Sequence, residues 1–88
     1  MNIVWTPSAW DEYLYWQTEN QRVLETINGL IKDIRRDPFK GLGKPEPLKF
    51  ALQGYWSRRI TIEDRLVYRV VGAGEAQQVQ IIQCRYHY

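Results

Sequence analysis

Residues 55–86, with the sequence YWSRRITIEDRLVYRVVGAGEAQQVQIIQCRY, decide the fold, because their apolar residues tend to recur at every second position. Successive side chains of a strand point to opposite faces of a sheet, so this period predicts strands. We expect three strands, over residues 55–62, 65–71 and 79–86, with a glycine-containing turn at residues 72–75. Consecutive strands joined by short turns form an antiparallel meander.

The parity of the residue number sorts these side chains into two faces of the sheet. Even-numbered positions are mostly apolar: Trp56, Ile60, Leu66, Tyr68, Val70, Ile82, Cys84 and Tyr86, with Arg58 as the exception. Odd-numbered positions are mostly polar or basic: Ser57, Arg59, Thr61, Arg65, Arg69, Gln83, Arg85 and His87, with Val67 and Ile81 as apolar members. We predict a core face on the even side and an open, basic face on the odd side. A β-bulge would reverse the parity beyond it.

The chain before the meander contains one short strand and two helices. Residues 2–5 predict the strand, and Thr6 can cap a helix that follows it. Asn20 can cap a second helix, in which the 3.6-residue apolar period continues until Pro38 ends it. We therefore predict an α+β domain: the N-terminal strand and an antiparallel helical pair pack on one face of a small, twisted, mostly antiparallel sheet.

Length and charge restrict the class of protein. A chain of 88 residues makes one domain, residues 1–88, with a modest core. Its net charge of +2 is unevenly distributed, because residues 1–20 carry −3 and residues 21–88 carry +5. A basic region favours a polyanionic partner such as nucleic acid, although the solvated surface of an ordinary basic protein explains it as well.

Cysteine and histidine usage narrows the class further. The single cysteine, Cys84, cannot form an internal disulfide, and we expect a small buried residue rather than a nucleophile. One cysteine and one histidine do not make a metal site, so neither a metal nor a cofactor is expected. The sequence shows no signal peptide and no membrane-spanning stretch, so a soluble, cytoplasmic protein without membrane contact is expected.

The loop at residues 37–47 contains the sharpest single candidate for a functional residue. Glu46 stands between two prolines, which restrict the backbone and favour an extended conformation. Lys44 and Lys49 flank it and could bind phosphate. A stiffened carboxylate beside basic groups suits a general base, whereas a solvated loop glutamate is the simpler interpretation.

His87, the only histidine, follows the last predicted strand directly. A positioned imidazole is the side chain best suited to transfer a proton near neutral pH. Arg85 and Tyr88 beside it are residue types that bind phosphate and stack on bases. A lone histidine near a chain end is more often structural or merely exposed, so the residues alone leave its role open.

Five blocks of sequence, spread over the whole chain, form a specific combination. They are WDEYLYW at 10–16, GKPEPLK at 43–49, WSRRI at 56–60, RLVY at 65–68 and CRYHY at 84–88. Together they resemble the YoeB toxins, which belong to the RelE-like superfamily of toxin–antitoxin endoribonucleases. The resemblance implies a RelE-like fold with a concave catalytic sheet face, and metal-independent cleavage of mRNA at the ribosomal A site, which inhibits translation.

The resemblance also implies partners. These are the ribosome and its mRNA, and a YefM-like antitoxin that masks the toxin and connects it to operator DNA. A homodimer is a further candidate assembly.

Site residues follow from the resemblance position by position. The implied catalytic set consists of Glu46 as general base, Arg65 as phosphate stabiliser and His87 as general acid. Positions implied to support them by binding RNA or phosphate are Lys49, Arg59 and Tyr88, with Lys44 and Arg85 as further candidates. Asp64 departs from the family just before Arg65, where an acid would weaken the field of that arginine.

Two other classes of protein would use the same features. A non-catalytic RNA-binding module would need the basic face but neither Glu46 nor His87. A partner-binding protein would instead dock its aromatic first helix on another chain.

Overall fold

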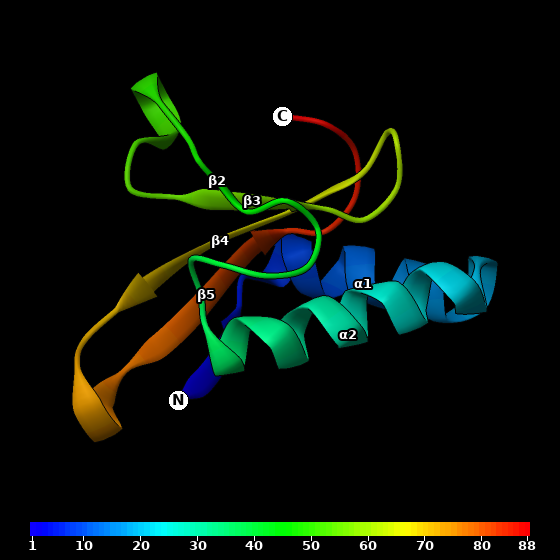
Figure 1. Ribbon diagram of the computed structural model, residues 1–88. Coiled ribbons are helices and arrows are strands. Elements are labelled where there is room, and N and C mark those ends of the chain that lie inside the picture. The colour runs from blue at the N-terminus through cyan, green and yellow to red at the C-terminus, as the bar shows by residue number, and fades with distance from the viewer.

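The computed structural model describes residues 1–88. Its elements are β1 (Asn2–Trp5), α1 (Pro7–Glu19), α2 (Gln21–Arg36), β2 (Glu46–Pro47), η1 (Phe50–Leu52), β3 (Trp56–Arg59), β4 (Arg65–Val71), η2 (Gly74–Ala76) and β5 (Gln78–Gln83). Five strands form one sheet in the order β1-β5-β4-β3-β2, in which β1 pairs parallel with β5 and every other pair is antiparallel. The helical pair lies on one side of the sheet, and the end of the chain rises on the other (Figure 1). This confirms the predicted α+β fold, except that the N-terminal strand β1 is an edge strand of the sheet and does not pack on its face.

Both helices begin at the residues that the sequence predicts. Thr6 Oγ1 accepts a hydrogen bond from the amide of Ala9 at 3.2 Å, and Asn20 Oδ1 accepts one from the amide of Val23 at 3.2 Å. Such caps satisfy amides that have no partner within the helix. Neither helix combines the length and the apolar character that crossing a membrane requires.

The core lies between the helices and the sheet. Its fully buried members include Ala9, Ile27 and Ile34 from the helices, and Leu66 and Ile81 from the sheet.

A β-bulge changes the predicted faces of β5. Val67 is the register partner of Gln83 and Tyr68 that of Ile81, so Ile82 is an extra residue between the two pairs. Ile81 is therefore buried in the core and Ile82 is only half-buried, which is the reverse of the prediction. The predicted parity holds through β3 and β4, which contain no such insertion.

Two strands are shorter than predicted. β3 ends at Arg59 because the hydroxyl of Thr61 accepts hydrogen bonds from the amides of Glu63 and Asp64, which closes a turn. β5 ends at Gln83 rather than at Tyr86, so Tyr86 is exposed instead of contributing to the core.

The predicted loop at residues 37–47 contains a short strand, β2, at the edge of the sheet. Glu46 is paired with Ser57 and Pro47 with Trp56. The amide of Arg59 donates to the carbonyl of Gly43 at 2.7 Å, just before this strand. A Cβ atom on Gly43 would approach Leu30 Cδ2 to 2.8 Å, so only glycine fits without rearrangement.

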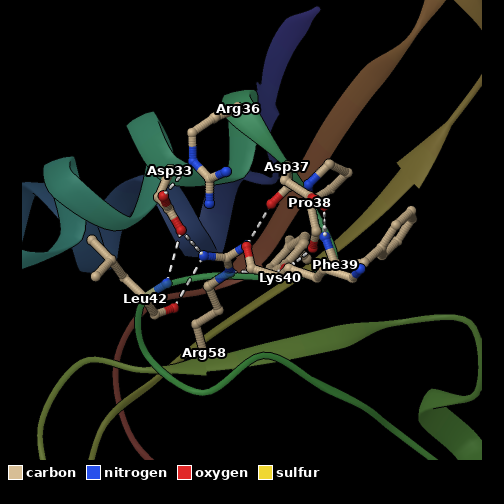
Figure 2. Close-up of polar contacts among 9 residues, drawn as sticks. Asp33, Arg36, Asp37, Pro38, Phe39, Lys40, Leu42 and Arg58 are labelled. Carbon is tan, nitrogen blue, oxygen red and sulfur yellow. Dashed lines mark hydrogen bonds and ion pairs between the residues drawn. The ribbon is translucent and has the colours of Figure 1, made fainter.

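Arg58, the exception in the even-numbered set, is fully buried and fixes this loop (Figure 2). Its guanidinium donates to Asp33 Oδ2 at 2.5 Å and to Tyr68 Oη at 3.1 Å. It also donates to three main-chain carbonyls of the loop, those of Asp37 (2.7 Å), Lys40 (3.1 Å) and Leu42 (3.0 Å). All five N–H donors of the arginine are thus matched by acceptors.

Asp33 completes this cluster from α2. Its Oδ2 also accepts the amide of Leu42 at 2.8 Å, and its Oδ1 accepts Nε of Arg36 at 3.0 Å. The Leu42 amide and then the Arg58 guanidinium are the main causes that lower the pKa of Asp33 from 3.8 to about 2.

We expect Arg58→Met to destabilise the fold by about 3–5 kcal/mol, because it leaves buried acceptors without donors. Urea unfolding at neutral pH measures this. Arg36→Met is the matched control, since Arg36 contacts the same carboxylate with an exposed side chain. It should cost less than about 1 kcal/mol, and equal losses for the two variants would contradict the central role of Arg58.

The lowered pKa of Asp33 predicts that the protein loses stability at acidic pH. A carboxyl group with a lowered pKa in the folded state stabilises that state above its unfolded pKa, 3.8, and loses this contribution as the pH falls to about 2. The free energy of unfolding should therefore decrease over this interval. Asp33→Asn should be less stable at neutral pH and should show a shallower decrease, as measured by urea unfolding at several pH values.

Candidate active site

The candidate site lies on the open face, the side of the sheet opposite the helices. Glu46, Ser57, Val67 and Gln83 are successive register partners and form a row across β2, β3, β4 and β5. Directly opposed residues of antiparallel strands share a face. Val67 and Ser57 are buried, although neither belongs to the helix-facing core.

Two arginines form the adjacent row. Arg59 and Arg65 are register partners on β3 and β4. Nη1 of Arg65 donates to the carbonyls of Thr61 (2.8 Å), Ile62 (3.1 Å) and Asp64 (3.1 Å), which orients the guanidinium. Its Nε and Nη2, and the whole exposed side chain of Arg59, make no hydrogen bond within the chain. Since opposed like charges are unfavourable in a sheet, this pair suits an anionic ligand.

Glu46 projects from the edge strand β2, and its extended backbone agrees with the effect predicted for the flanking prolines. Lys44 Nζ lies 3.8 Å from Glu46 Oε1, and both side chains are substantially exposed. Lys49, also exposed, precedes η1. The edge of the sheet therefore places the Glu46 carboxylate beside Lys44, and Lys49 follows β2 along the chain.

Residues 84–88, which we call the tail, bring the last two side chains to the open face. The hydroxyl of Tyr88 lies 3.1 Å from Ser57 Oγ, and Ser57 is the register partner of Glu46. The imidazole of His87 packs on the Tyr88 ring with the centroids 4.7 Å apart. His87 Nδ1 lies 3.0 Å from the main-chain oxygen of Tyr88, and the imidazole remains exposed. The tail thus turns onto the side opposite the helices (Figure 1).

Hydrogen bonds hold the tail at Tyr86. The amide of Tyr86 donates to Asp64 Oδ1 at 2.7 Å, and its carbonyl accepts the amide of Arg65 at 3.0 Å and Nε2 of Gln83 at 3.1 Å. The tail is therefore fixed by a turn and not, as the sequence analysis assumed, by a continuing strand.

A second set of contacts holds the tail at Cys84. Its amide donates to Glu12 Oε1 at 2.8 Å, and its carbonyl accepts Nε1 of Trp16 at 2.9 Å. Burial raises the pKa of Glu12, and the hydrogen bond from Cys84 opposes this shift. Burial, with the nearby Glu12 and Asp64 carboxylates, raises the pKa of the Cys84 thiol to about 12. The expected burial of Cys84 is confirmed, and a thiol with a raised pKa is a poor nucleophile.

Arg85 lies apart from the other candidates. Its guanidinium carbon is 3.5 Å from the centroid of the Tyr15 ring on α1 and 4.5 Å from that of Tyr86. The prediction that Arg85 shares the open face with Arg59 and Arg65 is wrong, because β5 ends at Gln83 and the turn that follows does not continue the alternation to residue 85.

Sequence reasoning missed three residues that organise the site. Ser57 joins the tail to β3, while Asp64 and Glu12 accept tail amides. The only signal for Asp64 was its unusual position before Arg65, which we interpreted as an effect on charge. Ser57 was a small polar residue among the odd-numbered, mostly polar or basic positions, and nothing in the sequence distinguished Glu12 from other acidic residues of a helix.

A shallow hollow of about 510 Å³ lies elsewhere on the molecule. Its lining comes from α2 and the following loop: Gly29, Lys32, Asp33, Arg36 and Leu42. None of these belongs to the open face. No group of three or more His, Cys, Asp or Glu side chains is arranged to hold a metal ion.

Solved structures that are similar to this chain include several toxins. A YoeB/ParE toxin from Agrobacterium tumefaciens matches with a TM-score of 0.98 and 58% identity over the whole of both chains. The toxin chain of a YoeB–YefM complex from Staphylococcus aureus has a TM-score of 0.88 and 44% identity, covering 100% of this chain and 98% of that one. A YoeB dimer from the same organism has a TM-score of 0.89 at 43% identity, with the same coverage.

Sequence comparison agrees with the structural match. Toxin YoeB of Escherichia coli K12 is 54% identical over 88 residues, which cover both chains completely. The family model described as the YoeB-like toxin of bacterial type II toxin–antitoxin systems matches residues 5–88. The chain therefore belongs to the YoeB-like toxins of bacterial type II toxin–antitoxin systems.

Proposed function

We propose that this toxin is an endoribonuclease that cleaves mRNA in the ribosomal A site and so inhibits translation. One observation carries the proposal: a carboxylate, a pair of arginines and an imidazole come from separate segments to a single open face. Glu46 and Tyr88 both adjoin Ser57, His87 packs on Tyr88, and the arginine pair occupies the next row. Acid, base and phosphate-binding groups on one face are what RNA cleavage requires.

The proposed reaction is an internal transesterification. Glu46 removes the proton from a ribose 2′-OH, whose oxygen attacks the adjacent phosphorus. The bond from phosphorus to the 5′ oxygen breaks, and protonated His87 gives its proton to that oxygen. The products are a 2′,3′-cyclic phosphate and a free 5′-hydroxyl. At neutral pH a glutamate accepts a proton more readily than it donates one, and a histidine can still donate, which fixes the two roles.

Cationic side chains supply the charge that this reaction needs. The Nε and Nη2 donors of Arg65 match the geometry of a phosphate, and Arg59 lies opposite. Lys44 and Lys49 extend the positive surface along the backbone of the RNA. Tyr88 is 46% exposed, and its ring can stack on a base. The scheme needs no metal, because the arginines and lysines fill its electrostatic role.

The same open face is the proposed target of the antitoxin. A relative from S. aureus has been solved with YefM, and a YefM-like antitoxin is the partner we propose for this chain. An acidic segment that orders on binding would neutralise the arginine pair and connect the toxin to operator DNA. A homodimer is a second proposed assembly, on the model of the S. aureus YoeB dimer.

Glu46→Gln and His87→Gln should each retain the fold and lower the rate of cleavage by about 10²–10⁴-fold, because each removes a proton-transfer group. New mRNA ends from translating ribosomes, mapped with purified protein, provide the measurement. Glu25→Gln, which neutralises an exposed glutamate on α2, is the matched control and should cleave normally. Normal cleavage by both test variants would exclude Glu46 and His87 as the proton-transfer groups.

An mRNA with 2′-deoxyribose at the scissile nucleotide should bind the toxin–ribosome complex and resist cleavage, because it lacks the nucleophile. The comparison uses the same message with ribose at that position and 2′-deoxyribose one nucleotide away. Cleavage of both messages at equal rates would require water as the nucleophile and would exclude the scheme above.

A further inference from the structure

Tyr86 has a strained backbone at the point where the tail turns onto the open face. Its φ of +68° lies in the left-handed region, which residues other than glycine seldom adopt. Such a conformation persists where surrounding contacts determine it. Here the amide and the carbonyl of Tyr86 are both engaged, the first by Asp64 and the second by Arg65 and Gln83. The side chain of Tyr86 is mostly exposed, so these main-chain bonds are what fix the turn.

Asp64 is the only one of these partners that acts through a carboxylate, and both of its oxygens are used. Oδ1 accepts the amide of Tyr86 at 2.7 Å, and Oδ2 accepts the hydroxyl of Thr61 at 2.8 Å. The oxygen of Thr61 in turn accepts the amides of Glu63 and Asp64, at 3.1 and 3.0 Å. One side chain thus joins the tail to the turn between β3 and β4.

The same turn orients the guanidinium of Arg65. Its Nη1 donates to the carbonyls of Thr61, Ile62 and Asp64, all of which lie in that turn. The residue after Tyr86 is His87. A displacement of the turn therefore moves the phosphate-binding arginine and the imidazole together.

We propose that Asp64 is a positioning residue that couples the placement of Arg65 to that of His87 and holds the tail in its cleavage geometry. This inference rests on the proposed function. Asp64 touches no reacting atom in this scheme. It acts through Tyr86 on one side and through the turn on the other, and small displacements of reacting groups lower rates strongly.

If Asp64 acted through its charge, its removal would have the opposite effect on activity from the loss of its hydrogen bonds. Experiment can therefore separate the effect of the charge from the effect of the hydrogen bonds. A carboxylate close to Arg65 weakens the attraction of that arginine for phosphate, so its removal alone would strengthen RNA binding. Asp64→Asn removes the charge and the acceptor of the Thr61 hydroxyl but keeps an oxygen for the Tyr86 amide. Asp64→Ala removes both the charge and the hydrogen bonds. Glu63→Ala, at the adjacent exposed acid, is the control for charge in this turn.

The experiment combines the mobility of the tail with cleavage kinetics. Backbone ¹⁵N relaxation of His87 and Tyr88 is measured in the free toxin, and kcat and KM are measured with translating ribosomes. We expect Asp64→Ala to increase the mobility of both amides and to lower kcat about 10- to 100-fold with little change in KM. Asp64→Asn should stay within about threefold of the parent in kcat, and Glu63→Ala should match the parent in both measurements.

Unchanged mobility in Asp64→Ala, or increased mobility with an unchanged kcat, would overturn the proposal. Equal increases in activity for Asp64→Asn and Asp64→Ala would also overturn it, because charge alone would then explain the residue. Failure of the proposed function has a different result, since the parent toxin would then produce no new mRNA ends, or His87→Gln would cleave normally, whatever the relaxation data show.

Discussion

A guanidinium with no exposed surface must place all five of its N–H donors, and this requirement of Arg58 organises the centre of the molecule. Three of its acceptors are carbonyls of the loop between α2 and β2, and a fourth is the carboxylate of Asp33. The loop has no helix or strand until Glu46, so its path depends on these bonds. Arg58, on the helix-facing side of the sheet, therefore determines the position of β2 at the sheet edge and with it the position of Glu46.

The alternation of side chains in β3 connects the core to the site. Arg58 points toward the helices and fixes the loop, while its neighbours Ser57 and Arg59 point to the open face. The Ser57 hydroxyl forms a hydrogen bond with the Tyr88 hydroxyl, and Ser57 is the register partner of Glu46, while Arg59 stands opposite Arg65. Three consecutive residues of a strand therefore build both the support and the surface, because a strand changes face at every residue.

The other half of the site depends on carboxylates. Glu12 accepts the amide of Cys84, and Asp64 accepts the amide of Tyr86, so the residues before and after Arg85 are both held. The Arg85 guanidinium stacks on the rings of Tyr15 and Tyr86. A short segment at the end of a chain is ordinarily mobile, since few contacts hold it. Here the hydrogen bonds at Cys84 and Tyr86 order the tail, and Tyr86 adopts a left-handed backbone conformation in this arrangement. The two sides of the candidate site, edge strand and tail, are thus held by different interactions.

The sequence by itself determined the features that depend on near neighbours. The caps at Thr6 and Asn20, the helical pair, β4 and the extended backbone at Glu46 are all set by residues within a few positions. Only the tertiary structure decided where β5 bulges, which way the tail turns and what Arg85 contacts. These depend on packing between β4 and β5 and on hydrogen bonds such as that from Tyr86 to Asp64, 22 residues away. A local sequence pattern does not identify partners that lie far apart in the chain. The residues of β5 also fit an alternating pattern whether or not one residue is inserted, so the pattern does not reveal the bulge.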